Sequence, residues 1–111
     1  MYLLNNDKLK NRSPFLTWLF FNKQLKKDCV ESIPIICGDI DKMYEVKTRA
    51  HEIKDIKSEL KLNELQKSMT VLYLECVEIK AKHRLLKSRL TFNNVLNIVL
   101  TLRALDKILS E

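Results

Sequence analysis

Glycine and proline are almost absent from this chain, which has one glycine and two prolines among 111 residues. Tight turns rely on these two residue types, so their scarcity disfavours a sheet-rich or loop-rich fold. From Asp39 to Glu111 neither residue occurs. Charged residues make up 31% of the chain and apolar residues 46%, which is unlike a disordered tail. We therefore predict an elongated all-α protein.

Long apolar runs and paired cysteines are also missing. The longest apolar runs, 15–21 and 95–102, are far shorter than the ~20 residues that cross a bilayer. The apolar start of the chain precedes its first charges, which is the reverse of a secretory signal. The three cysteines form no CxxC pair, and we interpret them as reduced thiols. These observations indicate a cytoplasmic or nuclear protein.

The most regular pattern in the chain is a seven-residue apolar repeat between residues 62 and 90. Its members alternate in spacings of three and four, which places them on one seam of a helix. A seam of this kind needs a second helix to cover it. We therefore predict a partner interface formed by Leu62, Leu65, Met69, Leu72, Cys76, Ile79, His83, Leu86 and Leu90.

The chain divides into an N-terminal segment, residues 1–38, and a helical unit, residues 39–111, which joins a long coiled-coil helix to a C-terminal helix. In the first segment Ser13 and Pro14 are typical of a helix start, because serine caps a helix and proline fits its first position. Aromatic residues follow at once. The pattern predicts a short aromatic helix over about 14–31.

Pro34 and Gly38 are expected to end that first helix. Asp39 or Asp41 then suits the positive end of a second helix. This central helix is predicted to run to about residue 90, a length of roughly 76 Å.

Two discontinuities are predicted after the start of the central helix. The apolar seam changes phase between Leu60 and Leu62, which indicates local unwinding or a change of partner. At residues 91–94 the seam would place asparagines inward, so we expect a kink or short turn there. A terminal helix of about 94–109 should follow, and because it is apolar on more than one side it should be buried among other helices.

Basic residues concentrate near the end of the seam, where residues 79–90 carry five basic side chains and no acidic one. Four of these flank the seam, at positions where charges select a partner helix: Lys80, Lys82, Lys87 and Arg89. We predict that they select an acidic partner. The alternative is that the block, with the basic residues of 1–27, contacts nucleic acid or a ribosome. No aromatic residues interleave with the block and no base-reading motif is present, which favours the protein partner.

Catalytic chemistry has no visible site in the sequence. The lone Gly38 excludes a glycine-rich phosphate loop, and the acidic residues fall where a solvated helix face would place them. Cys76 and His83 are ~10 Å apart along a helix, so they would need ligands from another chain to hold a metal ion. We expect no enzyme activity, no metal site and no cofactor.

The aromatic residues have a distribution of their own, because half of them lie between Phe15 and Phe21. With Lys23, Lys26 and Lys27 close behind, residues 15–27 could contact a membrane surface. The interpretation that we favour is that this segment covers the apolar C-terminal helix.

The C-terminal stretch is similar to the end of snapin-like subunits of lysosome-positioning complexes in Lys82-His83, in 93–96 and in 103–109. The spacing between these pieces departs from that family's, and coiled-coil sequences share such pieces by chance. The similarity transfers no residue role to this chain.

The patterns as a whole favour a non-enzymatic helical scaffold. We expect an interaction subunit that joins other helical chains through the coiled-coil seam, as a hetero- or homo-oligomer.

Overall fold

The computed structural model describes residues 3–86 and 89–110, with the side chains of all of these except 83–86. A 3-10 turn, Leu3–Asn5, precedes five described helices: α1 (Asp7–Asn11), α2 (Pro14–Phe20), α3 (Asn22–Glu52), α4 (Ile56–Leu86) and α5 (Phe92–Ser110). No strand occurs within these ranges. The predicted all-α class is confirmed, and so is the elongated shape, which measures 48 × 27 × 20 Å.

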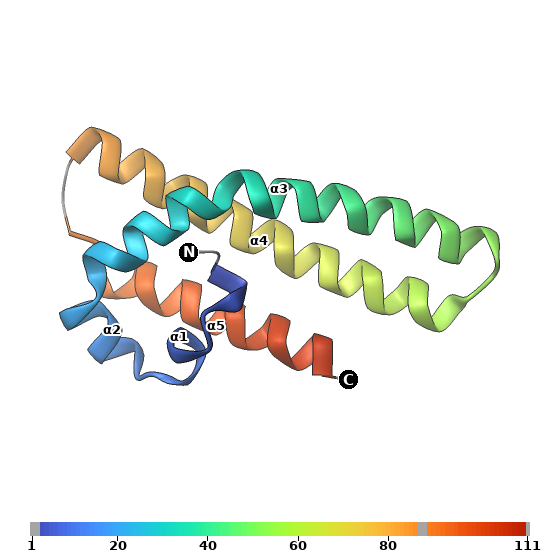
Figure 1. Ribbon diagram of the computed structural model, residues 1–111, viewed down its shortest axis with the longest axis horizontal. Coiled ribbons are helices and arrows are strands. Elements are labelled where there is room, and N and C mark those ends of the chain that lie inside the picture. The colour runs from blue at the N-terminus through green and yellow to red at the C-terminus, as the bar shows by residue number, and fades with distance from the viewer. Residues whose placement is uncertain (1–2, 87–88, 111) are drawn as a thin grey trace.

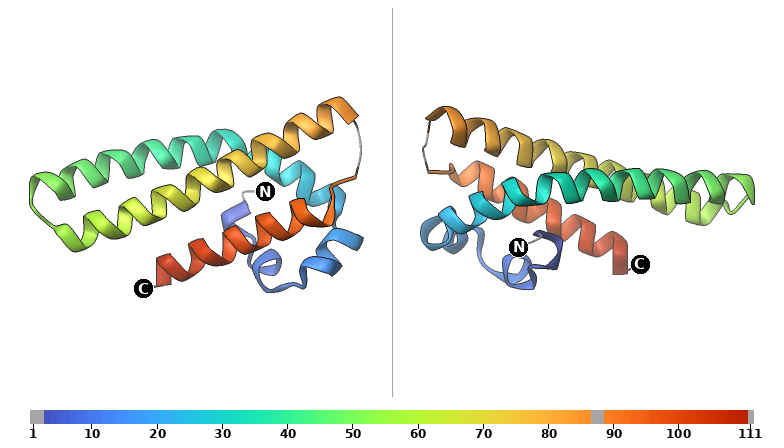
Figure 2. Two further views of the ribbon diagram at one scale, coloured as in Figure 1. Left: turned by 180° about the vertical axis from the view of Figure 1, so that it is seen from behind. Right: turned by 45° about the horizontal axis from the view of Figure 1, so that its top comes forward.

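The long helices α3 and α4 form an antiparallel hairpin, and α5 folds back along α4 (Figure 1). The short helices α1 and α2 pack against α5 and close one end of the molecule. At the other end the hairpin extends beyond α5 as a bare pair of helices (Figures 1 and 2). One end of the hairpin is therefore covered by the other helices, whereas the other end is exposed to solvent on several sides.

The central helix predicted between residues 39 and 90 is not continuous, because the chain reverses at residues 53–55. Lys54 adopts the left-handed backbone conformation, with φ of 59°. The backbone N–H groups of Lys54 and Asp55 donate to the carbonyls of His51 and Ala50, an arrangement that ends a helix. The reversal thus needs no glycine or proline, which is why composition did not predict it.

Asp55 begins the next helix, since its carboxylate accepts a hydrogen bond from the Ser58 N–H at 3.2 Å. Hydrogen bonds from the side chain and the backbone of Ser58 lower the pKa of Asp55 below its usual value. Across the turn, His51 Nδ1 lies 3.0 Å from Glu59 Oε1.

The unwinding predicted between Leu60 and Leu62 is misplaced, because these residues lie inside α4.

The break predicted between the aromatic helix and the central helix is wrong, since Pro34 and Gly38 both lie inside α3. Pro34 is exposed, so its ring meets solvent rather than packed side chains. Cys29 and Ile36, on either side of it, are fully buried, and their packing offsets the hydrogen bond that proline cannot make. Figure 1 shows α3 changing direction between its two halves, as expected near a proline.

The aromatic helix predicted over 14–31 is instead two helices, with Phe21 between α2 and α3. The domain boundary predicted at residue 38 falls inside α3. A break near residues 91–94 is confirmed, but it lies slightly earlier than predicted, because residues 89–91 are not helical and α5 begins at Phe92. There the Asn94 N–H donates to Thr91 Oγ1 at 3.2 Å, and the Thr91 hydroxyl donates to Asn94 Oδ1 at 2.7 Å. This reciprocal pair caps the helix.

One hydrophobic core joins the N-terminal turn, α1, α5 and the adjoining parts of α3 and α4. The N-terminal turn and α1 contribute Leu3 and Leu9, both almost fully buried. The α4 seam lies at the centre, between buried residues of α3 and α5. The α3 and α5 members of the core are Leu25, Cys29, Ile36, Val95, Ile98, Val99, Leu102, Leu105 and Ile108.

Candidate interaction surfaces

The seam residues are covered from within the chain. Most of them are buried against α3 and α5, Leu62 is half-buried, and the side chains of His83 and Leu86 lie outside the described residues. A second helix covers the seam, as the spacing requires, and it belongs to the same chain. In this structure a partner therefore needs a different surface from the buried residues Leu65, Met69, Leu72, Cys76, Ile79 and Leu90.

The basic residues that flank the seam have different surroundings. Arg89 donates hydrogen bonds to the carbonyl oxygens of Trp18, at 2.6 Å, and Leu19, at 2.8 Å, so it fastens α2 to the chain. Lys82 pairs with Glu78 at 3.0 Å on the same helix. Lys80 is exposed, and Lys87 lies outside the described residues. Selection of a partner by this block stays a prediction.

Glu75 places a carboxyl group between α4 and α5. Its Oε1 accepts a hydrogen bond from the Thr101 hydroxyl at 2.9 Å, whereas its Oε2 is buried without a described partner. Burial raises the pKa of Glu75 to about 7, although the bond from Thr101 opposes the shift. In the core next to Glu75, Cys76 forms a hydrogen bond with Cys29 of α3. This bond and burial raise the pKa of the Cys29 thiol well above its usual value. The Glu75 carboxyl group, which lies between α4 and α5, therefore titrates near neutral pH.

Replacing Glu75 with Gln should stabilise the protein at about pH 8 and change little at about pH 5. The folded-state pKa of about 7 lies above the ordinary value of 4.5, so stability falls as the pH rises between the two values. Gln is neutral at every pH, so at about pH 8 it should raise the free energy of unfolding by about 1–2 kcal/mol. This value is smaller than the full pKa shift implies, because solvent screens the partly exposed side chain. Urea unfolding at both pH values measures this difference, and an equal gain at both would contradict the assignment.

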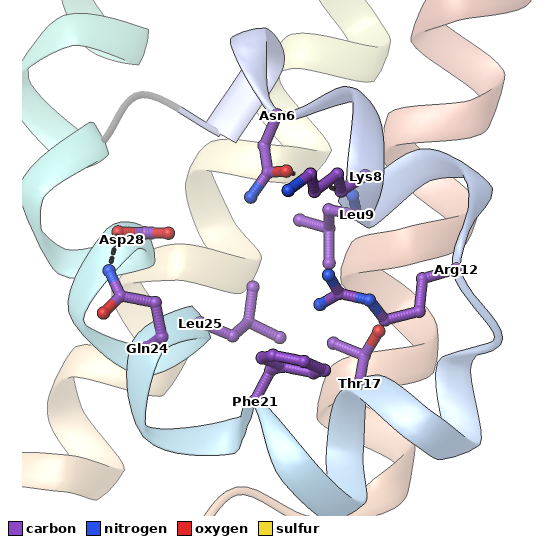
Figure 3. Close-up of a pocket in the computed structure, with 9 residues that line it drawn as sticks. All are labelled: Asn6, Lys8, Leu9, Arg12, Thr17, Phe21, Gln24, Leu25 and Asp28. Carbon is purple, nitrogen blue, oxygen red and sulfur yellow. Dashed lines mark hydrogen bonds between the residues drawn. The ribbon is translucent and has the colours of Figure 1, made fainter.

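A cavity of about 270 Å³ lies where α1, α2 and the start of α3 meet (Figure 3). Arg12 lies over the Phe21 ring at 3.7 Å, and Gln24 donates to Asp28 at 2.8 Å. Thr17 lines the cavity, and its buried hydroxyl has no described partner. Water in this cavity would satisfy that hydroxyl, because polar side chains such as Asn6 and Gln24 also line it. Its lining holds no nucleophile paired with a base, so we assign no reaction to it.

The outer face of α4 carries a second apolar stripe, which the sequence analysis did not identify. Along it lie five exposed apolar residues in two groups, one at the start of α4 and one between residues 71 and 77, and polar residues such as Lys67 lie between the groups. At 1.5 Å a residue the stripe is about 32 Å long. The missed signal was the recurrence of valine and leucine between the seam positions. The stripe consists of Ile56 (68% exposed), Leu60 (64%), Val71 (47%), Leu74 (58%) and Val77 (37%).

Helix α2 covers part of α5, as predicted, through the edge-to-face contact of Trp18 with Phe92 at 6.0 Å between ring centres. The opposite side of α2 faces solvent and is also apolar. Phe15, Leu16 and Phe20 are among its exposed side chains. The segment is thus more than a cover for α5.

Within the described ranges no group of three or more histidine, cysteine or acidic side chains is placed to hold a metal ion. The same ranges contain no helix with the length and apolar character needed to cross a bilayer. The cysteines are free thiols, with Cys29 and Cys76 buried and Cys37 exposed.

Comparison with protein-family models, with curated proteins and with solved structures finds no match for this chain.

Proposed function

We propose that the protein is a non-enzymatic helical subunit that binds other helical chains of a larger assembly through the outer face of α4. The observation that carries the proposal is the exposed stripe around Leu74. A helix that is apolar on opposite sides is normally buried among several helices. Here α3 and α5 cover only the seam side, so the stripe remains uncovered.

The geometry of the stripe fits a helix rather than a small ligand. It is long and follows one straight helix, so a partner helix lying along α4 would cover its full length. Glu78 and Lys80 are exposed beside its end and provide charges that a partner can match. We predicted a partner interface at the seam from the sequence, and we now propose that the interface lies on this outer face instead.

Replacing Leu74 with Asp should prevent assembly without unfolding the chain. The side chain is 58% exposed, so the carboxylate remains hydrated in the free chain but would be desolvated in a helix interface. We expect the purified wild-type chain to self-associate or precipitate at micromolar concentration, and the variant to sediment as a monomer with unchanged helical circular dichroism. A compact, soluble wild-type monomer would count against the proposal.

A photo-cross-linking residue locates the contact in cells. Placed at position 74 it should give one discrete adduct, whereas at Thr48, an exposed position on α3, it should give none. Adducts of equal yield at both positions would show that no specific face is used.

Binding to nucleic acid or a ribosome is the alternative. It has less support, because Arg89 and Lys82 of the basic block are engaged within the chain. A steep loss of RNA or DNA binding as salt is raised would favour it, since phosphate contacts release counterions whereas apolar contacts do not.

A further inference from the structure

Helix α2 turns its apolar side outward. The four outward residues are exposed, whereas Thr17, on the inward side, is fully buried. This is the reverse of the usual arrangement, in which the apolar stripe of a helix faces the core. The outward face of α2 consists of Phe15 (52% exposed), Leu16 (44%), Leu19 (39%) and Phe20 (69%).

Hydrogen bonds hold this face in place. Trp18 Nε1 donates to the Leu90 carbonyl at 2.9 Å, and the Arg89 guanidinium donates to two carbonyls at the end of α2. Arg89 also lies 5.0 Å from the centre of the Trp18 ring. The exposed apolar side chains therefore belong to a fixed helix, and a binding partner would not have to order it.

Cations adjoin the outward face. A groove of about 650 Å³ begins at Phe20 and continues past Lys23 and Lys27, both exposed. Glu31 lies at its far end, 4.0 Å from the Lys27 ammonium group. Between residues 8 and 27 the sequence has six basic side chains and no acidic one. An apolar surface bordered by lysines complements a surface that is apolar in depth and anionic at its boundary.

We propose that α2 binds the surface of an anionic membrane, with its outward face among the upper acyl chains and Lys23 and Lys27 against the headgroups. A lipid surface fits better than a protein groove because α2 is a short helix at the edge of the molecule (Figures 1 and 2) and its apolar side chains are exposed. Aromatic residues with adjacent cations are also the side chains that membrane interfaces favour. The proposal uses a different surface from the α4 stripe, so either can fail alone.

Flotation with vesicles tests the proposal on the full chain. The wild-type chain should float with vesicles of phosphatidylcholine and phosphatidylserine but only weakly with phosphatidylcholine alone. Absence of flotation with the anionic vesicles, or equal flotation with both kinds, overturns the proposal.

Paired variants separate the two parts of the surface. Phe15→Ser with Phe20→Ser should lower partitioning roughly tenfold or more, because two exposed anchors are removed. The control, Tyr44→Ser with Ile53→Ser on the far half of the hairpin, removes apolar side chains of comparable exposure (61% and 74%) and should have no effect. Equal losses in both pairs would show non-specific adhesion and overturn the proposal.

Charge reversal completes the test. Lys23→Glu with Lys27→Glu should abolish the preference for anionic vesicles, whereas Lys42→Glu with Lys57→Glu, equally exposed on the hairpin, should retain it. Unchanged vesicle binding in the first pair overturns the lipid assignment, and so does a position-specific protein cross-link from Leu16.

Discussion

Replacing Leu72 with Asp should abolish cooperative folding of the chain. Leu72 is fully buried on the seam of α4, between α3 and α5, and a carboxylate there has no cation to pair with among the buried neighbours. Loss of the packed leucine and desolvation of a charge together cost about 5 kcal/mol or more, which is comparable with the whole stability of a small domain. Thermal unfolding followed by circular dichroism should show no cooperative transition.

Two controls give this result its meaning. Glu78→Gln, on the exposed side of the same helix, removes only the ion pair with Lys82 and should cost less than about 0.5 kcal/mol. Leu74→Asp, two residues from Leu72 but facing solvent, should leave the chain folded. If Leu72→Asp instead gave a folded monomer, the seam would face another chain rather than α3.

Replacing Asn22 with Ala should destabilise the protein by about 2–3 kcal/mol. Asn22 is 7% exposed, and its amide group accepts from the Leu90 N–H at 2.9 Å and donates to the Leu90 carbonyl at 3.0 Å. Trp18 still donates to that carbonyl in the variant, but the N–H loses its partner in a buried position. The midpoint of urea unfolding measures the loss.

Hydrogen exchange gives a local check on the same change. The Leu90 amide should exchange much faster in Asn22→Ala, whereas amides in the middle of α3 should change only with global stability. Asn97→Ala, an exposed asparagine on α5, is the matched control and should lie within about 0.5 kcal/mol of wild type. Similar midpoints for the two variants would contradict the role of Asn22.

Two of the failures of sequence reasoning, at Pro34 and at Lys54, have different physical causes. Pro34 predicts a helix end, yet packing of Cys29 and Ile36 on either side of it outweighs one lost backbone hydrogen bond. Lys54 predicts no turn, yet it adopts a left-handed conformation that Asp55 supports by capping the next helix. At Pro34 tertiary packing decides the backbone conformation, whereas at Lys54 a few hydrogen bonds between residues 50 and 58 do, without the glycine or proline that would mark a turn in the composition.

The candidate surfaces were predictable to different degrees. The seam was found from its spacing, because a buried helix face leaves a strict period in the sequence. The outer stripe of α4 was missed because its residues, such as Val71 and Leu74, carry no period that distinguishes an exposed apolar face from a second buried one. The aromatic segment around Phe20 was noticed from composition, but its outward orientation depends on the contacts of Trp18 and Arg89.

The sequence by itself determined the helical class, the seam and the start of α5, because each depends on short-range periodicity or capping within a few residues. Only the tertiary structure decided what covers the seam. A three-residue reversal at 53–55 brings α3 of the same chain onto α4, and this occupies the face that another chain would otherwise cover. The surfaces that we propose for binding are therefore the opposite face of α4 and the outward face of α2, which the core of the chain leaves exposed.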